Sequence, residues 1–177
     1  MKRADFQFIL DKVLNKLSIW GGKLLSLAGK ITLVNSVLLA LPTYHNTLSL
    51  VPKQILIEVE KACRKFIWSK GDGSNGLHYA SWDLSCKPKS LGGLGINSCL
   101  KKTGPLRAKL AWKYCQEKES LMHKVLFPKY GQIPFENSSR RSRSVSWKLI
   151  CNGDNFLKPI VRWSIDNGSL VNVLKDT

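Results

Sequence analysis

Apolar residues near the start of the chain recur at the three- and four-residue spacing that places them on one face of a helix. Between Asp5 and Trp20 these residues are Phe6, Leu10, Val13, Leu17 and Trp20. A half-buried strand would need strict alternation instead. This part of the chain is therefore restricted to an amphipathic helix that buries one side, and Gly21 and Gly22 end it.

Two more helices are expected before residue 70. The first runs from about Lys23 to Leu41, has a wide apolar surface and stops at Pro42. The second opens at Pro52, where the missing N–H of proline costs nothing. Both would contribute apolar faces to the same core.

The helix that begins at Pro52 separates apolar from basic residues. Ile55, Val59, Cys63 and Phe66 are predicted to face the core, and the opposite side carries Lys61, Arg64, Lys65 and Trp68. Glu58 and Glu60 stand at helical spacing from Lys61 and Arg64, so we expect partial pairing of this charge. A solvated face is the alternative for the cations, whereas Trp68 among them could stack on a base.

The rest of the chain divides by composition into three parts. We predict a glycine-turn and basic helical connector over 71–130, a linker over 131–144, and a short helix with a β-hairpin over 145–177. Within the connector, 79–84 is predicted to form a short strand ahead of a tight turn in CKPKSLGGLG. Basic helices follow from about Pro105 to Lys118 and from about Ser120 to Lys129.

Net charge restricts the partners. Lys and Arg number 28 against 12 Asp and Glu, giving a formal net charge of +16. Between Lys87 and Lys129 ten basic residues are opposed by Glu117 and Glu119 alone. Such an excess attracts polyanions, of which nucleic acid is the first candidate and an anionic membrane surface the second. A well-solvated basic surface without a specific partner stays the simpler alternative.

Several activities find no support in the sequence. The chain lacks GxxxxGK[ST], GxSxG and any CxxC or HxxxH spacing, and its five cysteines include no close pair. We therefore expect no metal, no cofactor, reduced thiols and no enzyme in this chain on its own. The longest apolar stretch, Ile31–Leu41, is shorter than the roughly 20 residues that cross a bilayer. We expect an intracellular protein, nuclear or cytoplasmic, without a membrane role.

Five segments together resemble the open reading frame of plant LINE-type (non-LTR) retrotransposons, in the region after the reverse-transcriptase core. They read LSIWGGKLLSLAGKITLVNSVLLALPTYHNTLSLVPK at Leu17–Lys53, IEVEKACRKFIWSK at Ile57–Lys70, WDLSCKPKSLGGLGI at Trp82–Ile96, LAWKYC at Leu110–Cys115 and FPKYG at Phe127–Gly131. The predicted hairpin around Trp163 is similar to the family's segment before its zinc-binding region. The resemblance implies a mainly α fold whose 1–70 region is a helical thumb-like bundle gripping a template–primer duplex. The family's polymerase aspartates, zinc ligands and ribonuclease H carboxylates have no counterpart here.

The prediction is a noncatalytic part of a retrotransposon RNA-directed DNA polymerase that holds nucleic-acid backbone. Its partners would be RNA, DNA or an RNA–DNA hybrid, with the polymerase core as a further candidate. The binding residues predicted are Lys23, Lys30, Arg64, Lys65, Trp68, Lys87, Lys89, Lys109, Lys113, Arg140, Arg141 and Arg143. Two alternatives stay open: a decayed transposon relic without activity, and a reverse transcriptase or ribonuclease H enzyme.

Overall fold

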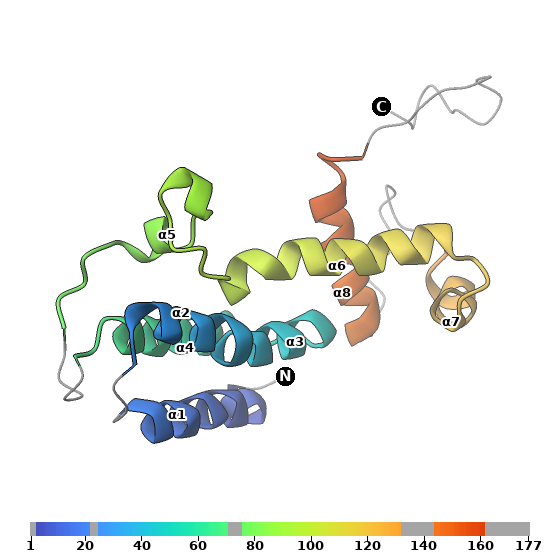
Figure 1. Ribbon diagram of the computed structural model, residues 1–177. Coiled ribbons are helices and arrows are strands. Elements are labelled where there is room, and N and C mark those ends of the chain that lie inside the picture. The colour runs from blue at the N-terminus through green and yellow to red at the C-terminus, as the bar shows by residue number, and fades with distance from the viewer. Residues whose placement is uncertain (1–2, 22–24, 71–75, 132–143, 162–177) are drawn as a thin grey trace. The chain divides into compact units, whose positions relative to one another are not determined.

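All the regular secondary structure is helical in the part that the structure, a computed structural model, describes: residues 3–21, 25–70, 76–131 and 144–161. The chain divides into two compact units, Met1–Thr103 and Gly104–Thr177 (Figure 1). The expected mainly α character is confirmed for these residues. The boundary between the units falls inside the 71–130 region predicted as a connector.

The first unit is built on the apolar stripe of the first helix. A short turn, η1 (Arg3–Phe6), leads into α1 (Gln7–Gly21). Ile9 and Val13 are fully buried and α1 packs against α4. Arg3, the first residue of η1, forms an ion pair of 2.8 Å with Glu58 of α4. Glu58 thus pairs across the bundle, and the predicted pairing with Lys61 is not the contact it makes.

The second helix continues past the proline that was expected to stop it. Residues Leu27–Leu33 form α2, Val34–Leu38 form a wider π-turn labelled η2, and Ala40–Leu48 form α3. The π-turn is closed by Leu39 N donating to Val34 O at 2.9 Å. A proline ring inside a regular helix clashes with the carbonyl four residues before it, here Leu38. The wide turn ends at Leu38, the residue whose carbonyl the ring would meet, and the chain continues as α3.

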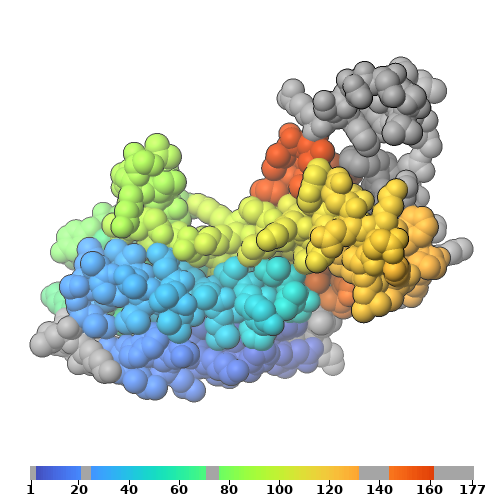
Figure 2. Space-filling model, turned by 45° about the vertical axis from the view of Figure 1, so that its right-hand side comes forward, coloured from blue at the N-terminus to red at the C-terminus, as the bar shows by residue number. Residues whose placement is uncertain are grey.

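One helix among the described residues, Leu27–Leu48, is long and apolar enough to cross a membrane by length and composition. The expectation from the sequence considered Ile31–Leu41 alone and ended at Pro42. Val34, Leu38 and Leu39 of this helix are buried in the core of the first unit. Figure 2 shows its surface lying along that of α1. Buried helices of soluble proteins can have the same length and apolar composition, so this helix is weak evidence for a membrane segment.

The third helix, α4 (Lys53–Ile67), begins directly after Pro52 as predicted. Its apolar side supplies Ile55, Leu56, Val59 and Cys63 to the core, each almost completely buried. It also contacts α1, α2 and η2. This helix is therefore the central element on which the rest of the first unit is assembled.

The predicted strand over 79–84 is wrong. The chain there is irregular up to Ser81 and then forms a short helix, α5 (Trp82–Ser85). Ser81 has extended backbone and its side chain accepts a bond from Leu84 N, as an N-cap residue does. The alternation read as a strand is thus a capping sequence, and the described residues contain no strand. The expected C-terminal β-hairpin lies outside the described residues.

The second unit has its own small core. Helix α6 (Cys99–Gln116) starts earlier than the predicted Pro105, α7 (Leu121–Tyr130) matches the predicted span, and α8 (Val145–Leu157) extends the short helix expected after 144. Ala111, Tyr114, Trp147 and Ile150 are buried together. The Tyr130 ring stacks on Trp147 at 4.6 Å between centroids.

Candidate nucleic-acid interface

The segment Trp82–Ile96 forms a compact turn that presents two lysines. The carbonyl oxygen of Ser85 accepts bonds from Leu94 N at 3.1 Å and from Ile96 N at 3.2 Å. Lys87 O accepts from Gly95 N at 3.0 Å. The two ends of the turn are therefore tied together by backbone bonds. The tight, structured turn predicted for CKPKSLGGLG is confirmed.

Two of its glycines are needed for separate reasons. A Cβ on Gly93 would lie 2.1 Å from the carbonyl oxygen of Lys87, so a side chain cannot fit. Gly92 has a φ of 76°, in the left-handed region, but open space around it. The backbone N–H groups of Gly92, Gly93 and Gly95 all donate within the turn. These N–H groups are therefore not available to cradle a phosphate.

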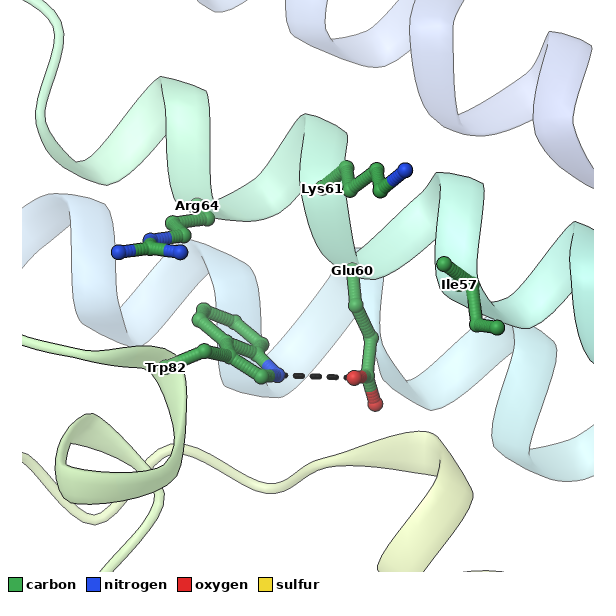
Figure 3. Close-up of a pocket in the computed structure, with 5 residues that line it drawn as sticks. All are labelled: Ile57, Glu60, Lys61, Arg64 and Trp82. Carbon is green, nitrogen blue, oxygen red and sulfur yellow. Dashed lines mark hydrogen bonds between the residues drawn. The ribbon is translucent and has the colours of Figure 1, made fainter.

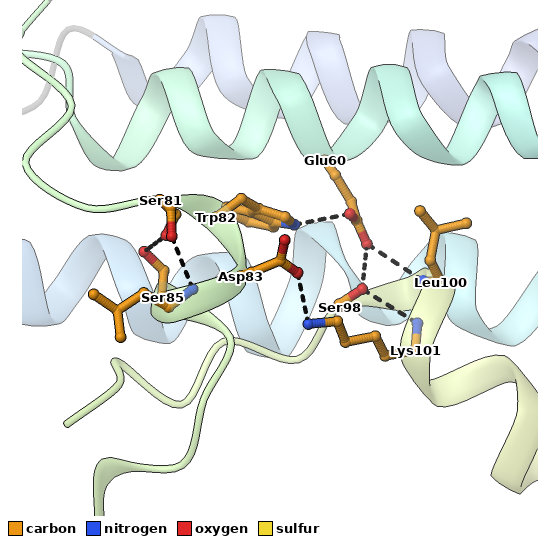
Figure 4. A network of polar contacts seen from close by, with 9 residues as sticks. Glu60, Ser81, Trp82, Asp83, Ser85, Ser98, Leu100 and Lys101 are labelled. Atoms are coloured by element: carbon orange, nitrogen blue, oxygen red, sulfur yellow. Dashed lines mark hydrogen bonds and ion pairs between the residues drawn. The ribbon is translucent and has the colours of Figure 1, made fainter. Parts of the chain in front are cut away.

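Glu60 of α4 anchors this turn and the start of α6 (Figure 4). Its side chain is buried, and its Oε2 accepts from Trp82 Nε1 at 2.8 Å. The other oxygen, Oε1, accepts from Ser98 Oγ at 2.7 Å and Leu100 N at 3.3 Å. A carboxylate is favourable at a helix N-terminus, where N–H groups lack partners. Glu60 therefore serves structure, and the predicted pairing with Arg64 is replaced by these contacts.

Asn35, inside the π-turn of the second helix, fixes the other end of the glycine segment. Its Nδ2 donates to Gly95 O at 3.1 Å and its Oδ1 accepts from Asn97 N at 2.8 Å. One amide side chain thus forms hydrogen bonds with both a backbone donor and a backbone acceptor. Together with Glu60 it holds the turn against the first unit's core.

The lysines of this turn are exposed. Lys87 and Lys89 have no acidic partner in the part of the chain that the structure describes. Lys101, by contrast, forms an ion pair of 2.8 Å with Asp83. The hydrogen bond and charge of Lys101 lower the pKa of the Asp83 carboxyl. Lys87 and Lys89 therefore offer the less compensated positive charge of this segment.

Lys30 occupies a different environment from the one predicted. It is buried, its Nζ donates to Ser69 O at 2.6 Å and to Ser69 Oγ at 3.1 Å, and it lies over the Phe66 ring. These contacts satisfy the carbonyl and hydroxyl groups that follow the end of α4. Lys30 is thus engaged inside the first unit and is not exposed for contact with a phosphate.

The end of α4 combines cations with two aromatic rings. Lys65 is exposed, Arg64 is half-buried, and Trp68 packs partly against the core. The Trp68 ring meets Tyr79 edge to face, with centroids 5.5 Å apart. Tyr79 is 80% exposed, which makes it the ring with more free surface for stacking. Tyr79 was missed because nothing in its neighbouring residues places it beside Trp68.

A small open hollow of about 130 Å³ lies between α4 and α5 (Figure 3). Ile57, Glu60, Lys61, Arg64 and Trp82 line it. Arg64 Nη2 donates to Ala80 O at 3.3 Å, while its buried Nε has no hydrogen-bond partner among the described residues. The volume is below the several hundred Å³ of a typical small-molecule site. The hollow is large enough for one small group.

The predicted residues of the second unit lie on α6. Lys109 and Lys113 are exposed, and Lys113 forms an ion pair of 3.3 Å with Glu117 one turn later. Lys124 of α7 is similarly paired with Glu119 at 2.8 Å. The two acids of this region therefore neutralise part of the local basic excess. Lys23, Arg140, Arg141 and Arg143 lie outside the described residues.

Within the described ranges, no three His, Cys, Asp or Glu side chains lie close enough together to bind a metal ion. Cys63 and Cys99 are buried and Cys115 is exposed. Burial raises the pKa of the Cys63 thiol to about 12, with a further contribution from the Glu60 carboxylate. Such thiols stay protonated near neutral pH, unlike activated cysteines.

The chain is similar to one curated plant protein over most of its length. An Arabidopsis thaliana protein named "Putative ribonuclease H protein" is 33% identical over 157 residues, which cover 86% of this chain and 25% of the relative. The chain thus spans about a quarter of that relative's length. No family model and no solved structure matches it.

Proposed function

We propose that this chain is a noncatalytic, nucleic-acid-binding part of a plant retroelement-type protein. It would hold RNA, DNA or an RNA–DNA hybrid through phosphate contacts that do not depend on base sequence. A polymerase core would supply the chemistry from elsewhere in a longer protein. The similarity to part of a plant protein with a ribonuclease H name supports this proposal, because such a name implies a nucleic-acid substrate.

One observation carries the proposal. Lys87 and Lys89 protrude from a turn that Glu60 and Asn35 tie to the core, and they have no acidic partner among the described residues. A rigid mount reduces the conformational entropy that binding would cost. The net charge of +16 adds long-range attraction for any polyanion. In the first unit Lys65 joins this set, and in the second unit Lys109 is a separate candidate, whereas Lys113 is already paired with Glu117.

The test is the salt dependence of affinity for a short RNA–DNA hybrid. Each phosphate contact that a lysine makes contributes about 0.9 to the slope of log affinity against log salt for a B-form duplex. We expect the double variant Lys87→Ala, Lys89→Ala to reduce that slope by nearly 2 on the same scale. A variant with Lys101→Ala is the matched control, because Lys101 is already paired with Asp83. A flat salt dependence of the unmodified chain would refute backbone binding.

Catalysis is tested separately. The purified chain should neither extend a primer nor cleave the RNA strand of the hybrid when Mg²⁺ or Mn²⁺ is added. Metal-dependent turnover of either kind would overturn the noncatalytic assignment and favour the enzyme alternative.

A further inference from the structure

We propose that the hollow beside Arg64 receives one phosphate of a single-stranded nucleic acid, with the adjoining base on the Tyr79 ring. This inference rests on the proposed function and adds a defined site to it. The hollow lies between α4 and α5 (Figure 3), and neither Lys87 nor Lys89 of the glycine turn lines it.

The first argument is an unused donor. Arg64 Nε is buried and without a hydrogen-bond partner among the described residues, and within the same residues the guanidinium makes one long hydrogen bond, from Nη2 to Ala80 O at 3.3 Å. A buried donor left unpaired loses its bond to water and gains none in return, which is unfavourable. Guanidinium groups offer Nε and one Nη in a planar fork that suits two oxygens of a phosphate. A phosphate in the hollow would pair with this unpartnered donor once the Arg64 guanidinium turns toward it.

The second argument is the charge of the lining. The lining contains two cations, Lys61 and Arg64, and one carboxylate, that of Glu60. Both oxygens of Glu60 already accept bonds, from Trp82 Nε1 on one side and from Ser98 and Leu100 on the other. The carboxylate is therefore committed to structure, and the lining keeps an excess of one positive charge. Its electrostatics favour an anionic group.

The third argument identifies the type of strand. Ala80, whose carbonyl accepts from Arg64, directly follows Tyr79, and the Tyr79 ring is 80% exposed. Trp68 supports that ring from its edge. An aromatic face beside a cationic phosphate site is the arrangement that binds unpaired bases, since every base can stack on it. In a duplex the bases are stacked on one another and do not present this face. A single strand is the occupant that uses both features.

The experiment compares two variants of the full chain binding a short oligothymidylate. Arg64→Lys keeps the charge but removes Nε and the planar fork, so we expect affinity to fall about tenfold with an unchanged salt slope. Lys65→Ala, one position on and outside the hollow, removes a charge and should lower the slope by about 0.7 instead. Tyr79→Ala should weaken oligothymidylate binding and leave hybrid binding unchanged. Wild-type affinity in Arg64→Lys would overturn the site.

A second measurement uses the unmodified chain, so that folding of the variants cannot obscure the result. The Nε–H resonance of Arg64 is followed by NMR while inorganic phosphate, oligothymidylate or its uncharged methylphosphonate analogue is added. We expect saturable shifts with the first two probes and none with the third. No shift with either charged probe overturns the phosphate site. A shift with inorganic phosphate alone overturns the assignment to a nucleic-acid strand.

The two proposals fail in different ways. If Arg64→Lys binds normally while Lys87→Ala, Lys89→Ala loses salt-dependent affinity, the hollow is not a site and the proposed function stands. If the unmodified chain shows no salt-dependent binding to either strand type, the proposed function itself fails.

Discussion

The indole Nε1 of Trp82 donates to the buried carboxylate of Glu60 across 2.8 Å, and this bond joins the central helix to the glycine turn. The same carboxylate accepts from Ser98, just before α6, and from Leu100 in the first turn of that helix. One acidic side chain therefore holds three segments that are distant in sequence. The exposed lysines depend on it for their fixed position.

Replacing Glu60 with Gln should destabilise the first unit. The amide keeps the shape but loses the charge that strengthens these bonds, and one of its ends carries N–H donors that face other donors. We expect a loss of about 2–4 kcal/mol in the free energy of unfolding, measured by urea denaturation. Glu58→Gln is the control, since its pair with the exposed Arg3 should contribute less than about 1 kcal/mol. Equal effects of the two variants would contradict the anchoring role.

Gly93→Ala and Gly92→Ala should differ although the residues are adjacent. Alanine at 93 places its Cβ against the Lys87 carbonyl, so the turn must open, and we expect a cost above about 2 kcal/mol. Alanine at 92 meets no atoms and suffers only the left-handed backbone, about 1 kcal/mol. Thermal unfolding of both variants measures the difference. A larger effect at 92 than at 93 would show that the turn is built otherwise.

Asn35→Asp should weaken the attachment of the glycine segment. The carboxylate can still accept from Asn97 N, but it cannot donate to Gly95 O and would repel that carbonyl. We expect a loss of about 1–3 kcal/mol and faster hydrogen exchange at Leu94 and Ile96, whose N–H groups lie in the turn. Ser36→Ala is a suitable control on the exposed side of the same helix. Unchanged exchange in Asn35→Asp would argue against this attachment of the glycine segment by Asn35.

Alkaline pH should destabilise the first unit through its buried thiols. The pKa of Cys63 is about 12 in the folded protein, whereas an unfolded cysteine titrates near 8.5–9. The unfolded chain therefore loses its proton first, and stability that is complete below about pH 9 declines as pH rises toward 12. The slope reaches about 1.4 kcal/mol per pH unit for each such thiol. Cys63→Ala should show a shallower decline between pH 9 and 11 in urea titrations, and identical pH profiles would refute it.

Close approach of α8 to α6 should make Gly153 intolerant of a side chain. An added Cβ would lie 2.1 Å from the Arg107 carbonyl oxygen, so Gly153→Ala must separate the helices. We expect a cost of about 3 kcal/mol, seen as faster hydrogen exchange in both helices. Asn152→Ala, at an exposed neighbouring position, should change stability by less than about 0.5 kcal/mol.

The sequence predicted helix positions correctly where the apolar periodicity and the prolines affect only neighbouring residues. Pro52 marks the start of α4 because a proline at a helix start has no intrahelical bond to lose. Pro42 was wrongly predicted to end the second helix. The helix continues past this proline because a π-turn precedes it, and no local sequence pattern predicts a π-turn. The strand over 79–84 was wrong for a related reason. Ser81 caps a helix of only four residues, too short to show a period.

In the candidate interface, too, local features could be predicted from the sequence and contacts between distant residues could not. Exposure of Lys87 and Lys89 could be predicted because a glycine- and proline-rich turn lies at the surface. The burial of Lys30 could not, since it depends on Ser69, 39 positions later. The role of Glu60 could not be predicted either, because its spacing from Arg64 suggested an i,i+4 ion pair instead. Its actual donors come from α5 and α6, so only the tertiary arrangement reveals them.

The π-turn at Val34–Leu38 amounts to one residue more than an ordinary helical turn would hold. That surplus residue rotates everything after it by about 100° relative to everything before it. Lys30, ahead of it, reaches Ser69, and Asn46, beyond it, donates to Thr103 Oγ1 at 2.6 Å. Deleting a single residue from this turn would restore regular pitch and swing one of these two side chains away from its partner. The chain's length here, down to one amino acid, sets which way the second half of the helix faces.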